Sequence, residues 1–160
     1  SDNGGVFLVP AFTGLGASHW DPHARGALFG LTRNTSFAHL ARAALEAVCC
    51  QTSDLVNAMN NDWSKSVKSV RVDGGMVAND WMLQFLADIL NAEIERPAVF
   101  ETTALGAAYL AGLRRDVYGS IVDIAAEWKR DTRYTAQMSD AVRAQLLDRW
   151  KSAVAATVSY

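Results

Sequence analysis

The chain has 160 residues, of which 50% are hydrophobic and 20% charged, and its formal net charge is −2. This composition is typical of a globular domain that builds its own core. The charge balance gives no sign of a nucleic-acid or membrane-surface partner, and no apolar run approaches the roughly 20 residues that span a bilayer. We therefore expect neither nucleic acid nor a membrane among its partners.

Strand patterns and helix patterns alternate along the chain. Apolar runs predict strands at four places, of which the third is expected to be buried: 6–9, part of 26–32, 67–72 and 94–96. Apolar residues at three- and four-residue spacing predict helices at 37 to about 60, 80–90 and 103–113. The remainder is predicted as a looser tail that ends in a helix with one apolar face: Val142, Leu146, Leu147, Trp150 and Val154. Alternating strands and helices predict an α/β layered domain with partly parallel pairing.

Two features of the sequence bear on its cellular location. The first five residues contain no methionine, no basic segment and no apolar segment. They do not match a signal peptide, and we expect a sequence cut from a longer chain. Cys49 and Cys50 are adjacent, which places them badly for an ordinary structural disulfide. We predict two reduced thiols in a helix, as in a cytoplasmic protein.

A glycine pair and an asparagine separate the 67–72 strand from the 80–90 helix. Gly74 and Gly75 follow the strand, and Asn79 directly precedes the helix. Ligands of open α/β sheets bind outside the carboxyl ends of the strands, where glycine lets the backbone approach them closely. The helix start adds free N–H groups, and the Asn79 amide suits an adenine edge or a ribose. The alternative is a tight strand-to-helix turn in which Asn79 or Asp80 caps the helix.

Several charged side chains have expected partners. Arg42 and Glu46 are four residues apart on a helix, which predicts an ion pair that contributes little to stability. Glu93 and Glu95 are expected to be solvated charges at a strand edge. Asp73 ends a strand, where it contacts a metal or a phosphate, or else bonds to nearby backbone N–H groups.

The glycine-rich segment 10–36 contains weaker candidates for a site. His19 and His23 have a zinc-ligand spacing that works on a helix, but Pro22 interrupts it. The loop FTGLGA, residues 12–17, lacks the lysine of a phosphate-binding P-loop. We therefore predict no catalytic residue and no metal ligand in this sequence.

Taken together, five segments are more specific than any one motif: VPAFTGLGASHWDPHARGALFGLTR, HLARAALEAVCCQT, RVDGGMVANDWMLQFLADIL, IERP and ETTALGAAYLAGL. Residues 5–113 closely resemble the C-terminal domain of the glycerol kinases, which belong to the carbohydrate kinase family with an actin-like ATPase fold. The residues from Gly26 to Leu31, with His39-Leu40 and 43–46, fit the second signature of that family. Sister sugar kinases usually carry a different loop in place of FTGLGA, which favours glycerol over a sugar.

The resemblance implies a fold and a domain organisation. The fold is α/β, a partial actin-like ATPase (ribonuclease H-like) domain with a mixed sheet and packed helices. Its first strands lie outside this sequence and leave a bare sheet edge beside 6–9. Residues 1–120 are expected to form the adenine side of the C-terminal kinase domain, and residues 121–160 an extension that ends in a helix.

The resemblance also implies a function. The parent protein is expected to be an ATP-dependent glycerol kinase, a phosphotransferase that forms glycerol 3-phosphate. The nucleotide-binding residues carried over are Gly74, Gly75, Met76 and Asn79. ATP or ADP and Mg²⁺ are the implied cofactors. The implied partners are a missing N-terminal catalytic domain and further copies of the parent. The alternatives are the same part of another sugar or polyol kinase, or a nucleotide-binding or interaction module without catalysis.

Overall fold

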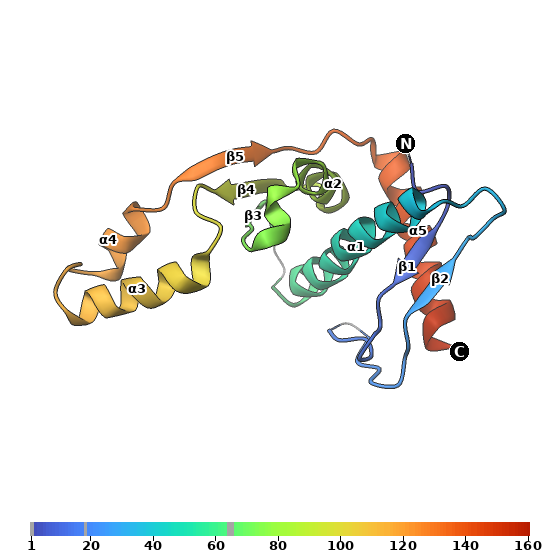
Figure 1. The fold of residues 1–160 in the computed structure, drawn as a ribbon, viewed down its shortest axis with the longest axis horizontal. Helices are drawn as coiled ribbons and strands as arrows, with labels where there is room; N and C mark the ends of the chain where they lie inside the picture. The colour runs from blue at the N-terminus through green and yellow to red at the C-terminus, as the bar shows by residue number, and fades with distance from the viewer. Residues whose placement is uncertain (1, 18, 64–65) are drawn as a thin grey trace.

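The structure is a computed structural model that describes residues 2–17, 19–63 and 66–160 (Figure 1). Its elements in chain order are β1 (Phe7–Val9), β2 (Ala27–Phe29), α1 (Phe37–Trp63), β3 (Ser69–Arg71), the 3₁₀ turn η1 (Gly75–Ala78), α2 (Asp80–Leu90), β4 (Glu93–Pro97), α3 (Thr102–Arg114), α4 (Ile121–Ala126), β5 (Arg130–Tyr134) and α5 (Asp140–Val158). Figure 1 shows α3 and α4 at the opposite end of the molecule from the β1–β2 pair, with α1 and α2 between them.

The strands of the described residues form two small sheets. In one, β1 and β2 pair antiparallel, with Phe7 opposite Phe29. In the other, β4 lies between β3, which runs parallel to it, and β5, which runs antiparallel. The connection from β3 to β4 passes through η1 and α2, as parallel pairing requires. A mixed sheet with packed helices confirms the predicted α/β class.

The predicted helices are confirmed, whereas one strand prediction needs correction and two elements were missed. The helix at 80–90 is confirmed residue for residue. The strand expected at 67–72 is shorter, and the prediction that it is buried is wrong. Ser69 and Arg71 are exposed, because β3 is an edge strand. In the predicted tail, α4 and β5 were missed. The β5 sequence RDTRY is polar, and it gives no apolar alternation to recognise.

The core has two clusters of buried side chains. The first joins β1, α1 and α5 around Val9 and Trp150, which are 0% and 1% exposed. Trp150 keeps its indole N–H satisfied by donating to Asp54 at 2.8 Å. The second cluster surrounds α2 and includes Leu83 and Ile94, both fully buried. This second cluster fixes the position of α2, and therefore of the glycine-containing turn from which α2 begins.

Helix α1 has apolar residues on two opposite faces. Small side chains such as Ala43, Ala47 and Cys50 are buried against its neighbours. The larger apolar stripe that predicted the helix is largely exposed, including Phe37 at 84% and Met59 at 50%. Large apolar side chains that gather on an exposed surface commonly mark a surface that another part of a protein covers. The described residues cover only one side of this helix.

Both cysteines are free thiols in helix α1, as predicted, and both are buried. Burial, together with the nearby charge of Glu46, raises the pKa of the Cys49 thiol to about 12. Burial also raises the pKa of Cys50. Neither thiol is therefore ionised near neutral pH, and both behave as small apolar core residues.

Leucine-to-alanine substitutions should have different effects on stability in the core and on the exposed side of α1. Leu83→Ala empties a site that is 0% exposed, and we expect it to lower the free energy of unfolding by about 2–5 kcal/mol. Leu55→Ala changes a side chain that is 46% exposed on α1, and we expect a change within about 0.5 kcal/mol. Urea denaturation followed by circular dichroism measures both. Equal losses in the two variants would contradict this assignment of the core.

Candidate functional site

The candidate site is the turn that leads from β3 into α2. After β3, the N–H of Val72 donates to the carbonyl of Glu95 at 3.2 Å, which continues the sheet for one more residue. The N–H of Gly74 then donates to the carbonyl of Phe100 at 3.1 Å. Gly74 has a φ of +86°, a conformation that side chains with a Cβ rarely adopt. The backbone itself therefore requires glycine at 74.

The next residues form η1, which is held at one point and open elsewhere. Val77 is 3% exposed and packs in the core cluster around α2. Its N–H donates to the carbonyl of Gly74 at 3.2 Å. Gly75 and Ala78 are exposed, and Met76 is 46% exposed. The turn thus presents a surface to solvent while Val77 holds it against the core.

Gly75 differs from Gly74 in what its own backbone needs. Its φ is not positive, and a Cβ built on it meets no atom within 4 Å. A larger residue would therefore fit at 75 in the chain as it stands. The absence of a side chain there leaves an exposed strip of backbone to which a ligand can come close.

Asn79 caps α2, as one of the two sequence-based readings predicted. Its side-chain oxygen accepts a hydrogen bond from the N–H of Met82 at 3.1 Å. The capping bond uses the acceptor end of the amide and leaves its two N–H donors for other partners. Capping and ligand contact are therefore compatible at this residue. The four residues predicted to bind nucleotide lie in one short segment, with Gly75, Met76 and Asn79 exposed.

Asp73 has a side-chain partner in the structure. Its carboxylate accepts a hydrogen bond from the hydroxyl of Thr102, the first residue of α3. Neither of the two roles considered from the sequence is the contact observed. The bond ties the start of α3 to the segment just before the turn.

Sequence reasoning missed Arg96 of β4, which contacts the candidate turn. Arg96 Nη1 donates to the carbonyl of Val77 at 3.1 Å and to Asp80 Oδ1 at 2.6 Å. Asp80 Oδ1 also accepts from the hydroxyl of Tyr134 at 2.6 Å. The hydrogen bond from Tyr134 and, to a smaller extent, the one from Arg96 hold the pKa of Asp80 below its usual range. The positions of these partners are far apart in the sequence, so no local pattern signals the contact.

The prediction that Glu93 and Glu95 are solvated edge charges is wrong for Glu95, and for Glu93, which is 38% exposed, only the edge position is wrong. The side chain of Glu95 is 15% exposed and lies 2.7 Å from Arg130 and 3.5 Å from Arg71. Glu93 pairs with Arg133. These glutamates are on the central strand, and the strands on both sides place arginines opposite them. The predicted pair of Arg42 and Glu46 is confirmed at 2.7 Å.

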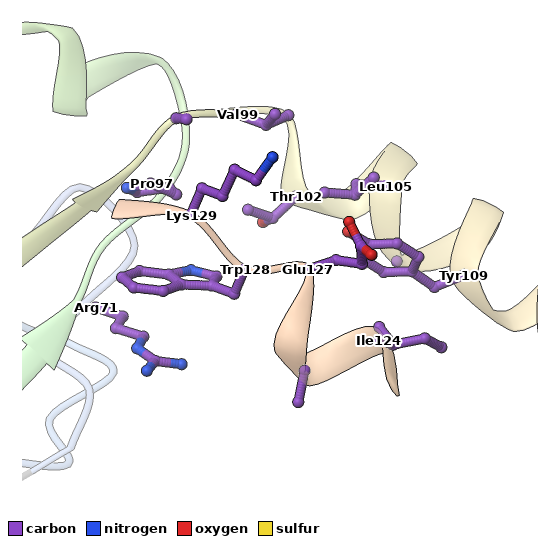
Figure 2. Close-up of a pocket in the computed structure, with 13 residues that line it drawn as sticks. Arg71, Pro97, Val99, Thr102, Leu105, Tyr109, Ile124, Glu127, Trp128 and Lys129 are labelled. Atoms are coloured by element: carbon purple, nitrogen blue, oxygen red, sulfur yellow. The ribbon is translucent and has the colours of Figure 1, made fainter. Parts of the chain in front are cut away.

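A cavity of about 460 Å³ lies between α3, α4 and the end of β4 (Figure 2), and none of the four predicted nucleotide-binding residues lines it. Its apolar lining includes Leu105 and Tyr109, and Trp128 stacks with the Arg71 guanidinium 4.0 Å from its ring centre. None of the residues of α3 is buried in the structure. We assign the candidate site to the turn at 74–79 because the exposed glycine and the free amide are there, whereas the cavity is mainly an apolar space beside an uncovered helix.

Within the described ranges, no group of three or more His, Cys, Asp or Glu side chains could hold a metal ion. Among these same residues, no helix is long and apolar enough to cross a membrane.

Comparison with known proteins shows the family. Residues 1–114 match the FGGY family of carbohydrate kinases, C-terminal domain. The chain is 57% identical to a glycerol kinase of Rhodospirillum centenum over 158 residues, and 56% identical to one of Rhizobium meliloti over 155 residues. These alignments cover 99% and 96% of the chain but only 32% and 31% of the two relatives. The chain belongs to the FGGY family of carbohydrate kinases and spans about a third of the length of these relatives.

Solved structures of the same family share the fold. The glycerol kinase of Plasmodium falciparum, solved with ADP, matches with a TM-score of 0.84 and 36% identity over 98% of the chain and 31% of that protein. A ligand-bound xylulose kinase from Lactobacillus acidophilus matches with a TM-score of 0.73 and 25% identity, over 98% of the chain and 33% of that protein. The elements described above therefore occur together in larger kinases.

The ionic contacts around β4 predict how stability depends on pH. The pKa values of Asp80, Glu95 and Asp131 are all lowered in the folded chain by hydrogen bonds to neighbouring side chains. A lowered carboxyl pKa contributes stability above the ordinary carboxyl range, and this contribution is lost as the pH falls through the folded value. We expect the melting temperature to be nearly constant from neutral pH down to about pH 5 and to fall below about pH 4.

Asp80→Asn tests the part of this effect that arises at the turn. The variant should melt below the wild type at neutral pH, by a small amount because the Asp80 side chain is exposed. The gap should close as the pH falls below about 4, where the wild-type carboxylate is also neutralised. Calorimetric melting of both proteins across this range is the measurement. A gap that widens in acid would contradict the assigned direction of the pKa shift.

Proposed function

We propose that the chain is the nucleotide-binding C-terminal part of an ATP-dependent glycerol kinase, which transfers the γ-phosphoryl group of ATP to glycerol and forms glycerol 3-phosphate. The choice of glycerol is supported by relatives at 52–57% identity that carry the name glycerol kinase. The segment FTGLGA, by which the sequence differs from sister sugar kinases, points the same way. A cytoplasmic location and a homo-oligomeric parent belong to the same proposal.

The observation that carries the proposal is the open backbone at Gly75 beside the free amide of Asn79. An adenine ring has flat faces and an edge with hydrogen-bond acceptors. Its face can lie against the strip of backbone at Gly75, where no Cβ intervenes. The amide N–H groups of Asn79 can donate to an acceptor on the ring edge or the ribose. Met76, half exposed, offers an apolar side to the same ligand.

The chain supplies one wall of the proposed site. Phosphoryl transfer needs positioned phosphates, a magnesium ion and a group that orients the attacking hydroxyl. We propose that Gly74, Gly75, Met76 and Asn79 bind and orient the adenine side of ATP or ADP. Magnesium would enter with the phosphates, and we assign it no ligand in this chain. The catalytic and glycerol-binding residues are proposed to lie in the rest of the kinase.

The uncovered apolar surfaces support a partner in the same polypeptide. The α1 stripe and helix α3 both expose large apolar side chains, such as Phe37 at 84% and Leu110 at 70%. We propose that the N-terminal catalytic part of the kinase packs against these surfaces, since the chain spans about a third of its relatives. Residues 1–120 then form the C-terminal kinase domain, and residues 121–160 an extension that adds β5 and α5 to it.

Nucleotide binding is tested by calorimetric titration of the chain with ADP. We expect weak binding that Asn79→Ala and Gly75→Val each reduce about tenfold or more. Asn79→Ala removes the proposed contact, and Gly75→Val places a side chain where the adenine face would lie.

Two matched variants separate a lost contact from a lost fold. Ser139→Ala removes an N-cap from α5 just as Asn79→Ala removes one from α2. Gly16→Val, like Gly75→Val, adds a side chain where a Cβ meets no atom within 4 Å. Both controls should bind ADP as the wild type does. Equal losses in all four variants, or none in the two test variants, would contradict the proposed site.

The proposal also predicts that this chain alone does not phosphorylate glycerol. It lacks a candidate for the group that orients the attacking hydroxyl. A coupled assay of glycerol-dependent ADP formation should give no signal above background with the purified chain. Turnover that copurifies with the chain and disappears in Asn79→Ala would contradict the proposal that the catalytic residues lie in the rest of the kinase.

A further inference from the structure

Arg96 holds the candidate turn from the side of the sheet. Its side chain is 13% exposed and leaves β4 on the same face as Ile94, the face that packs against α2. Nη1 donates to the carbonyl of Val77 at 3.1 Å and to Asp80 Oδ1 at 2.6 Å. Val77 lies two residues before Asn79, and Asp80 is the residue directly after Asn79. One guanidinium nitrogen therefore fixes the chain on both sides of Asn79.

The opposite side of the guanidinium is fixed to β5. Nε and Nη2 of Arg96 lie 2.8 Å and 2.7 Å from Asp131 Oδ2, and Nη2 also donates to the hydroxyl of Thr132 at 3.2 Å. Tyr134, on the same strand, donates its hydroxyl to Asp80. The contacts with β5 thus fix the rotamer of the Arg96 side chain, while its Nη1 is hydrogen-bonded to the turn. Figure 1 shows β4 and β5 side by side, with α2 next to them.

We propose that Arg96 is a positioning residue for the nucleotide site, which holds the backbone from Val77 to Asp80 so that the Asn79 amide points at the bound base. This inference rests on the proposed function. The turn needs such support because η1 is short and its Gly75, Met76 and Ala78 are exposed. Core packing anchors it only at Val77 among these residues.

The geometry requires arginine in particular. Four acceptors from three segments are reached by one planar group: the Val77 carbonyl, the carboxylates of Asp80 and Asp131, and the Thr132 hydroxyl. A lysine has a single ammonium that cannot serve both sides of this arrangement at once. Arg96→Lys therefore keeps the charge and most of the aliphatic chain but releases either the turn or β5.

The test compares Arg96→Lys with Arg130→Lys. Arg130 also comes from the sheet and pairs with a carboxylate, Glu95 at 2.7 Å, but none of its observed contacts reaches the turn. Three quantities are measured for each protein: the melting temperature, the hydrogen exchange of the amides of residues 75–79, and the dissociation constant for ADP. Tyr134→Phe, which removes one of the two hydrogen bonds to Asp80, serves as an intermediate case.

We expect Arg96→Lys to speed exchange at 75–79 and to weaken ADP binding about tenfold. Arg130→Lys should lower the melting temperature only slightly, because the Arg130 side chain is 45% exposed, and should leave both other quantities near the wild type. Tyr134→Phe should fall between them. Unchanged exchange at 75–79 in Arg96→Lys, or equal exchange in both lysine variants, would overturn the inference.

The outcomes separate this inference from the proposed function. If Asn79→Ala loses ADP binding and Arg96→Lys does not, the nucleotide site stands and the positioning role fails. If Asn79→Ala binds ADP as the wild type does, the proposed site fails regardless of Arg96. If the chain does not bind ADP at all, the exchange comparison is made without nucleotide, and it still decides whether Arg96 orders the turn.

Discussion

The parallel pairing of β3 with β4 is the constraint on which the rest of this structure depends. Two parallel strands that are neighbours in sequence must be joined by a crossover. Here the crossover is η1 followed by α2. Helix α2 packs on the sheet in one core cluster that contains the fully buried Leu83 of α2 and Ile94 of β4. The crossover must begin where β3 ends, so the exposed turn at 74–79 forms at that end of the strand. The same pairing places Arg96, near the end of β4, within hydrogen-bonding distance of that turn.

Hydrophobic and ionic contacts have different roles around this unit. Apolar packing of α2 against the sheet and α1 supplies the stability, while the arginines of β3, β4 and β5 pair with carboxylates across the exposed parts of the same sheet. Exposed ion pairs contribute little free energy, but those of Arg96 have fixed geometry on both sides. Large apolar side chains on α1 and α3 stay uncovered. The chain therefore has the surface expected of one part of a larger kinase core.

The sequence predicted best where one local pattern decides the structure. Helix α2 was placed to the residue because an apolar stripe, the Asn79 cap and the preceding glycines agree. The position of the candidate turn followed from the same segment. Strand β5 was missed because its five polar residues gain stability from β4, which is more than 30 residues away in the chain. Arg96 was missed for the same reason. The α1 pattern predicted the helix correctly, but no sequence pattern could show which of its two apolar faces the described residues cover.

The central claim is that the turn at 74–79 is the adenine side of a nucleotide site. The most direct test is a titration of the ¹⁵N-labelled chain with ADP, followed by the shifts of individual backbone amides. The account predicts that the largest changes occur at Gly75, Met76 and Asn79, with smaller ones at the start of α2. Changes concentrated instead around Tyr109 and Trp128, which line the cavity between α3 and α4, would contradict it.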